Sequence, residues 1–94
     1  MESDIADWRK RIDDIDLKLV ELLNERAGVV VEIAHCKRRE SLRVLDKTRE
    51  EAVLRSVSAK SAGPFTTGAI LRIFRAIVKE SRILQKQVMG PSNS

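Results

Sequence analysis

Apolar residues recur at alternating steps of three and four along the first third of the chain. This is the spacing of a heptad seam, in which one side of a long α-helix is apolar throughout. The seam positions are Ile5, Trp8, Ile12, Ile15, Leu19, Leu22, Arg26, Val29, Ile33 and Cys36. Acidic residues near the start and a basic run at the end suit the two poles of the helix dipole. The pattern predicts one helix from about Asp4 to Arg39, with Ser3 or Asp4 as its N-cap.

A helix of this length is too long for its own chain to cover. At 1.5 Å per residue it extends roughly 50 Å, whereas a compact domain of this size has a radius of gyration of about 12 Å. The far half of the apolar seam must therefore meet another molecule. A twofold homodimer, in which each long helix spans both subunits, is the simplest closed arrangement.

Two shorter helices are predicted after the long one. Residues 40–45 lack helical period, and Asp46 then offers an N-cap for a short second helix that ends at the Ser-Ala-Gly-Pro sequence of residues 61–64. Thr66 or Thr67 can cap a third helix. The seam of that helix consists of Ile70, Phe74, Ile77, Ser81, Leu84 and Val88. We expect an all-α domain of three helices over residues 1–90 and a frayed tail at 91–94.

Composition agrees with a helical chain but leaves the function open. Aromatic residues make up 3% of the sequence, too few for a typical sheet protein, and the net charge is +4. A basic field suits nucleic acid, an anionic membrane or a small acidic substrate, so the net charge alone does not distinguish these three kinds of partner. The sequence has no apolar run of membrane-spanning length, no signal-peptide pattern and a single cysteine. We expect a cytoplasmic protein with no membrane partner.

Polar side chains interrupt the apolar seams at two places. Arg26 takes a seam position on the first helix, and Lys37, eleven residues later, projects from nearly the same face. Ser81 interrupts the third helix, and Gln85 follows one turn later on the same side. One interpretation is that Arg26 pairs with a carboxylate from another helix while Lys37 extends into solvent. The other is that the two polar pairs face each other in the bundle and form a ligand site.

Other reactive side chains have simpler structural interpretations. Arg49 and Glu50 follow Asp46 at spacings of three and four, which fits a capping arrangement with a solvated ion pair. His35 has no second histidine or acid at ligand spacing, so we expect no metal site. Cys36 lies on the seam and fits a small buried hydrophobe.

Taken in order, these pieces resemble the all-helical class of chorismate mutases over about residues 8–87. Residues 9–16, RKRIDDID, and residues 22–26, LLNER, resemble the opening of the family's first helix. Lys37 falls where the family has a lysine near the end of that helix. Residues 46–50, DKTRE, resemble the second-helix motif, and Glu80, Ser81 and Gln85 resemble the third.

The resemblance implies a cofactor-free isomerase that rearranges the dianion chorismate into prephenate in aromatic amino-acid biosynthesis, within an intertwined homodimer. It implies that the substrate is bound by Arg9, Arg26, Lys37, Asp46, Arg49, Glu50, Ser81 and Gln85. The catalytic members of this set are expected to be Lys37, Gln85, Arg26 and Arg9. Since Arg9 and Arg26 lie about 25 Å apart along one helix, both cannot grip one small substrate from the same chain. In the family the N-terminal arginine crosses over, so we expect Arg9 to serve the partner's site.

Three other functions fit parts of the same sequence pattern. An isochorismate pyruvate lyase on the same scaffold also acts on a dianion by a pericyclic step, although that step fragments the substrate, but Glu50 and Ser81 resemble the mutase. An aminodeoxychorismate mutase, whose substrate carries an amine where chorismate has its hydroxyl, is not excluded by the sequence. A nucleic-acid-binding dimer is suggested by the basic run at 37–39. However, its basic residues alternate with acids and aromatics for base stacking are nearly absent, so we expect no nucleic-acid partner.

Overall fold

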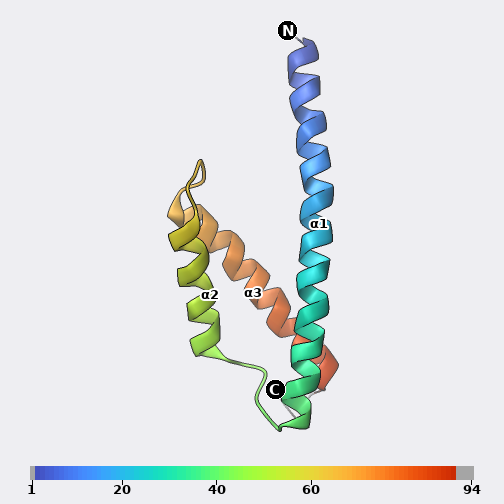
Figure 1. The fold of residues 1–94 in the computed structure, drawn as a ribbon, viewed down its shortest axis with the longest axis vertical. Coiled ribbons are helices and arrows are strands. Elements are labelled where there is room, and N and C mark those ends of the chain that lie inside the picture. The colour runs from blue at the N-terminus through green and yellow to red at the C-terminus, as the bar shows by residue number, and fades with distance from the viewer. Residues whose placement is uncertain (1, 91–94) are drawn as a thin grey trace.

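The computed structural model describes residues 2–90, which form three α-helices and no strand (Figure 1). Helix α1 spans Glu2–Arg39, α2 spans Lys47–Lys60 and α3 spans Thr67–Met89. The predicted all-α subunit with one very long N-terminal helix is therefore confirmed. The tail predicted at residues 91–94 lies outside the described residues.

Helix α1 begins earlier than the sequence predicts and ends at a defined turn. Its first residue is Glu2, so Ser3 and Asp4 lie within the first turn, and the prediction that one of them is the N-cap is wrong. At the other end Ser41 takes a left-handed conformation with φ 57°. The Leu42 amide donates to the Lys37 carbonyl at 2.8 Å. This is the long-range bond of a Schellman-type end, and it turns the chain back beside α1.

Both shorter helices begin at predicted caps. The Asp46 carboxylate accepts a hydrogen bond from the Arg49 amide at 3.0 Å, and the Thr66 hydroxyl accepts one from the Ala69 amide at 3.1 Å. Each bond satisfies a backbone donor that has no partner inside its helix. Helix α2 ends at Lys60, just before the predicted break at residues 61–64. The cap at Asp46 also places this acid and the first turn of α2 opposite α1.

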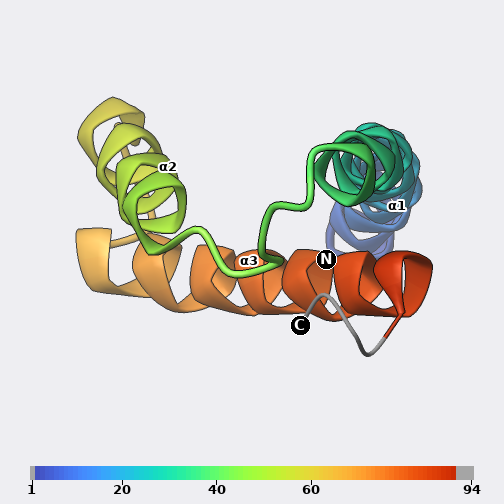
Figure 2. The same ribbon diagram turned by 90° about the horizontal axis from the view of Figure 1, so that it is seen from below.

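Helix α3 connects the other two in space. It crosses the C-terminal half of α1 and packs along α2 at its other end (Figures 1 and 2). The N-terminal end of α1 extends beyond the rest of the subunit (Figure 1). The described chain measures 59 × 24 × 16 Å and has a radius of gyration of 16.9 Å. A compact domain of this size would have a radius of gyration of about 12 Å, so α1 is longer than its own chain can cover.

The buried core lies at the C-terminal end of α1. Ala34, Val44 and Met89 form a cluster with at most 3% of their surface exposed, and Val88 packs against it. These residues join α1, the segment after it and the end of α3. Because the core is here, the adjacent polar residues of the three elements are held at fixed positions.

The N-terminal half of the α1 seam is uncovered within one subunit. At least 50% of the surface is exposed at each of Ile5, Trp8, Ile12, Ile15, Leu19 and Leu22. Exposed apolar surface of this extent along one helix is typical of an interaction site. No helix within residues 2–90 is long and apolar enough to cross a membrane.

Candidate active site

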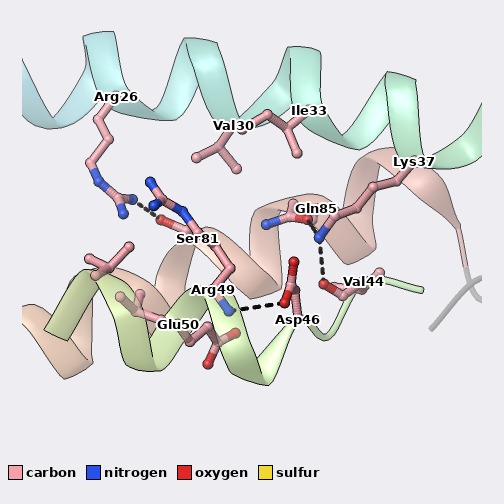
Figure 3. A pocket seen from close by; sticks show the side chains of 12 residues that line it. Arg26, Val30, Ile33, Lys37, Val44, Asp46, Arg49, Glu50, Ser81 and Gln85 are labelled. Atoms are coloured by element: carbon pink, nitrogen blue, oxygen red, sulfur yellow. Dashed lines mark hydrogen bonds between the residues drawn. The ribbon is translucent and has the colours of Figure 1, made fainter. Parts of the chain in front are cut away.

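A pocket opens where α1, α3 and the start of α2 meet, next to the buried core (Figure 3). Its polar lining consists of Arg26, Lys37, Asp46, Arg49, Glu50, Ser81 and Gln85. Its apolar lining consists of Val30, Ile33, Val44, Val53 and Val78. The sequence predicted all seven polar residues, which come from the three helices and the N-cap of α2, as site residues, but none of the valines.

Arg9 is the one predicted site residue that this pocket lacks. It is exposed on the N-terminal half of α1, seventeen residues before Arg26. At 1.5 Å per residue this separation is about 25 Å. Within one subunit the structure therefore brings seven of the eight predicted residues together and leaves Arg9 apart.

Arg26 and Ser81 meet across the α1–α3 interface. An Arg26 Nη1 hydrogen is donated to Ser81 Oγ, and Ser81 Oγ donates in turn to the Ile77 carbonyl at 2.9 Å. The Arg26 acceptor among the described residues is thus a hydroxyl, not the carboxylate that one interpretation required. A guanidinium has five N–H donors. The bond to Ser81 orients Arg26 and leaves donors and its full charge for a ligand.

Lys37 faces the pocket and does not extend into solvent. Its Nζ donates to the Val44 carbonyl and to Gln85 Oε1, both at 2.8 Å (Figure 3). An ammonium has three donors, so one remains for a ligand. Because the amide oxygen of Gln85 accepts from Lys37, the amide nitrogen points away from Lys37 (Figure 3). The amide nitrogen of Gln85 therefore remains a donor for a ligand, alongside the third N–H of Lys37.

The start of α2 contributes a capping acid and a third cation. Asp46 both caps α2 and lines the pocket, which confirms the capping part of the simpler interpretation. The Arg49 side chain extends from the first turn of α2 towards Arg26 and Ser81 (Figure 3). Arg26, Lys37 and Arg49 thus surround the pocket with positive charge.

Glu50 pairs with an arginine on α3 that the sequence analysis did not identify. Arg82 Nε lies 3.0 Å from Glu50 Oε2, and Arg82 Nη2 lies 3.2 Å from Glu50 Oε1. The hydrogen bond with Glu50, aided by the carboxylate charge, raises the pKa of Arg82 above its ordinary value despite some desolvation. Glu50 thus joins α2 to α3 through Arg82, a bond that the expected capping arrangement with a solvated ion pair did not include.

Comparison with known sequences identifies the family. The family model of chorismate mutase type II matches residues 8–86. This chain belongs to the chorismate mutase type II family. The family expected from the helix motifs is therefore confirmed, and the all-helical fold agrees with it.

Similar proteins include one of about the same length as this chain and others that are several times longer. The chain is 27% identical over 92 residues to a chorismate mutase of Methanocaldococcus jannaschii, covering 95% of this chain and 91% of that protein. It is 33% identical over 97 residues to a bifunctional chorismate mutase/prephenate dehydratase of Aquifex aeolicus, covering 95% of this chain and 27% of that protein. A protein of the same name from Buchnera aphidicola is 29% identical over 90 residues, covering 95% and 23%. The chain thus spans about a quarter of the length of the bifunctional relatives.

The charges of this family member suit a dianionic ligand. Three cations line the pocket, while Glu50 is paired with Arg82 and the Asp46 carboxylate caps α2. Among the described residues, no group of three or more His, Cys, Asp or Glu side chains could hold a metal ion. Cys36, expected to be buried, is only half-buried and accepts a hydrogen bond from Arg39 at 3.1 Å.

Proposed function

We propose that this chain is a chorismate mutase, an isomerase that converts chorismate into prephenate in aromatic amino-acid biosynthesis. The observation that carries the proposal is the pairing of Lys37 and Gln85 beside Arg26 in one pocket, in a chain of this family. We also infer that it acts in the cytoplasm, in keeping with its single cysteine.

The reaction places few chemical demands on a protein. The ether C–O bond breaks as a new C–C bond forms, in one cyclic shift of electron pairs within a single molecule. No proton is transferred and no group leaves, so neither a nucleophile nor a cofactor is required. The enzyme must hold the flexible dianion in its compact conformer and stabilise the negative charge that grows on the ether oxygen.

Arginines would set the conformer of the substrate. A guanidinium can bind a carboxylate through two parallel hydrogen bonds, which fixes orientation as well as charge. Arg26, held by Ser81, is available for one carboxylate, and Arg9 of the partner subunit would bind the other. Ser81 would support the carboxylate at Arg26, and Arg49 would complete the positive field.

Lys37 and Gln85 would stabilise the transition state. Each has a free donor on the side that faces the pocket, and both would donate to the ether oxygen. Because the charge on this oxygen develops as the bond breaks, the two donors bind the transition state more strongly than the substrate. Glu50 and the backbone near Asp46 would accept the hydrogen of the ring hydroxyl.

The site would be completed by a second copy of the chain. The exposed seam of α1 ends beside a hollow between α1 and α3. Its apolar lining consists of Leu23, Ala27, Ala76, Ile77 and Leu84, and its polar lining of Arg26, Glu80 and Ser81. A twofold homodimer would cover this surface and bring each Arg9 towards the other subunit's pocket. The length of α1 and the distance of Arg9 from the pocket support this arrangement.

A substrate assay tests the proposed function. The purified protein is expected to consume chorismate and to form prephenate, and Lys37→Ala is expected to lower kcat about 100-fold or more. Lys79→Ala, an exposed lysine on α3 away from the pocket, is the matched control and should leave the rate unchanged. Formation of salicylate and pyruvate from isochorismate, without prephenate from chorismate, would contradict the proposal and favour the lyase.

A further inference from the structure

Arg82 holds a carboxylate of the pocket from outside it. Glu50 lines the pocket, whereas Arg82 is not among the lining residues. The two N–H···O bonds, at 3.0 and 3.2 Å, engage both oxygens of Glu50 from one side. A two-point grip of this kind fixes the rotation of the carboxylate as well as its position. Arg82 can therefore influence a bound ligand only through Glu50.

The pair also changes what Glu50 can bind. An isolated carboxylate can bind either a cation or a neutral hydrogen-bond donor. With a guanidinium directly on it, the pair has no net charge, although each oxygen keeps a lone pair for a hydroxyl donor. A ligand ammonium at the same place would lie within a few ångströms of the Arg82 charge, which would repel it.

The pair is shielded from water only in part, and this bears on its strength. The Arg82 side chain is 38% exposed and that of Glu50 is 23% exposed. An ion pair at such a position adds little to folding stability. Glu50 is the more buried partner, and a ligand in the pocket would cover it further. With less water between them, the charge of Arg82 would act strongly on a charged ligand, although the pair contributes little to folding stability.

We propose that Arg82 is a positioning residue that makes the Glu50 subsite select a ring hydroxyl over a ring amine. The inference rests on the proposed function and extends it to the substrate class. Chorismate carries a hydroxyl at this position and aminodeoxychorismate carries an amine. An aliphatic amine is protonated at neutral pH, so the two substrates differ by one positive charge beside Arg82.

The experiment compares kcat/KM for chorismate and for aminodeoxychorismate in the wild-type protein and three variants. The wild type is expected to prefer chorismate. Arg82→Gln removes the charge, and the ratio of the two kcat/KM values should fall about tenfold or more. Arg82→Lys keeps the charge but loses the two-point grip, so its rates should fall while the preference remains. Arg75→Gln, exposed two turns earlier on the same side of α3, should change neither.

Each outcome decides between this inference and a structural role. If Arg82→Gln lowers kcat/KM equally for both substrates, the pair only joins α2 to α3 and the inference is wrong. Faster turnover of chorismate by Arg82→Gln would also overturn it, because Arg82 would then compete with the substrate for Glu50. If that variant does not fold, as judged by circular dichroism, Arg82→Lys decides. The inference is wrong if, in Arg82→Lys, the ratio of the two kcat/KM values falls by as large a factor as the kcat/KM for chorismate. A wild-type protein inactive on both substrates would overturn the proposed function itself.

Discussion

Lys37 of α1 donates a hydrogen bond to the side-chain oxygen of Gln85 on α3, with 2.8 Å between Nζ and Oε1. This bond leaves the amide nitrogen of Gln85 for the pocket and sets its orientation by the position of Lys37. The two donors proposed to face the breaking bond are thus coupled to each other. Any change that turns the Gln85 amide oxygen towards the pocket would also remove a partner of Lys37.

Replacing Gln85 by Glu should make the activity depend on pH. An amide does not titrate, so the turnover of the wild-type protein is expected to be nearly flat from about pH 5 to 9. In Gln85→Glu the new carboxyl must be protonated to donate to the ether oxygen, and the Lys37 ammonium beside it lowers the pKa of that carboxyl. Its protonated fraction therefore grows as the pH falls. The kcat of the variant should drop about tenfold or more between pH 5 and pH 8.

Circular dichroism at both pH values provides the control for this variant, since an unfolded protein would also lose activity. Equal activity of Gln85→Glu at pH 5 and pH 8 would mean that Gln85 does not face the breaking bond. The proposed role of α3 would then be wrong, although the argument for a dimer would be unaffected.

A charge on the uncovered seam of α1 should disrupt the dimer. Ile12 is 55% exposed within one subunit and lies one turn from Trp8. A carboxylate buried at an interface costs several kcal/mol (about 3 or more) when unpaired, so Ile12→Glu should dissociate or unfold the protein. Sedimentation velocity measures the mass, and the emission of Trp8, the single tryptophan, reports whether the seam is covered. Lys10→Glu, on the opposite side of α1, should stay dimeric. A folded, active wild-type monomer would contradict the dimer.

Mixing two inactive variants should restore activity if Arg9 serves the partner's site. Arg9→Ala and Arg26→Ala are each expected to lose about 100-fold or more in kcat/KM, because each removes a carboxylate contact. After unfolding and refolding together, a heterodimer would contain one intact site and one site lacking both arginines. Activity should therefore return to about a quarter of the wild-type value for random pairing. No recovery in any mixture would show that Arg9 acts in its own subunit or not at all.

Gly28 offers a test of stability. Nothing lies within 4 Å of the position that a Cβ would take at Gly28, so packing within the subunit does not require glycine there. Alanine is favoured over glycine inside a helix, and Gly28→Ala should raise the free energy of unfolding by about 0.5–1 kcal/mol. Urea denaturation at fixed protein concentration measures this difference. A loss of stability would indicate that a side chain of the partner subunit occupies the space.

Much of the fold follows from local signals in the sequence. The caps at Asp46 and Thr66 were predictable because a capping side chain bonds to a backbone amide only three residues away. The extent of α1 followed from its heptad seam. The prediction for its first residue was wrong because several polar residues in a row can each begin a helix, and helix ends vary by one or two residues.

The candidate site was predictable only as far as its residues interrupt a seam or match a motif. Arg82 does neither, and its partner Glu50 lies 32 residues away on another helix. Such a pair depends on how α2 lies along α3, which no local pattern specifies. The contact of Lys37 with the Val44 carbonyl escaped prediction for a similar reason, since it depends on the turn at Ser41 that folds the chain back beside α1.

The unbroken course of α1 restricts how its length can change in evolution. Helix α1 runs without interruption from Glu2 to Arg39, so the number of residues between Arg9 and Arg26 sets both their distance and their relative direction. One inserted residue would turn Arg9 by about 100°, and seven would restore its direction to within about 20° but shift it by about 10 Å. In the proposed dimer either change would move Arg9 out of the partner's site. Insertions and deletions are therefore expected in the two connecting segments and not in the stretch of α1 between Arg9 and Arg26.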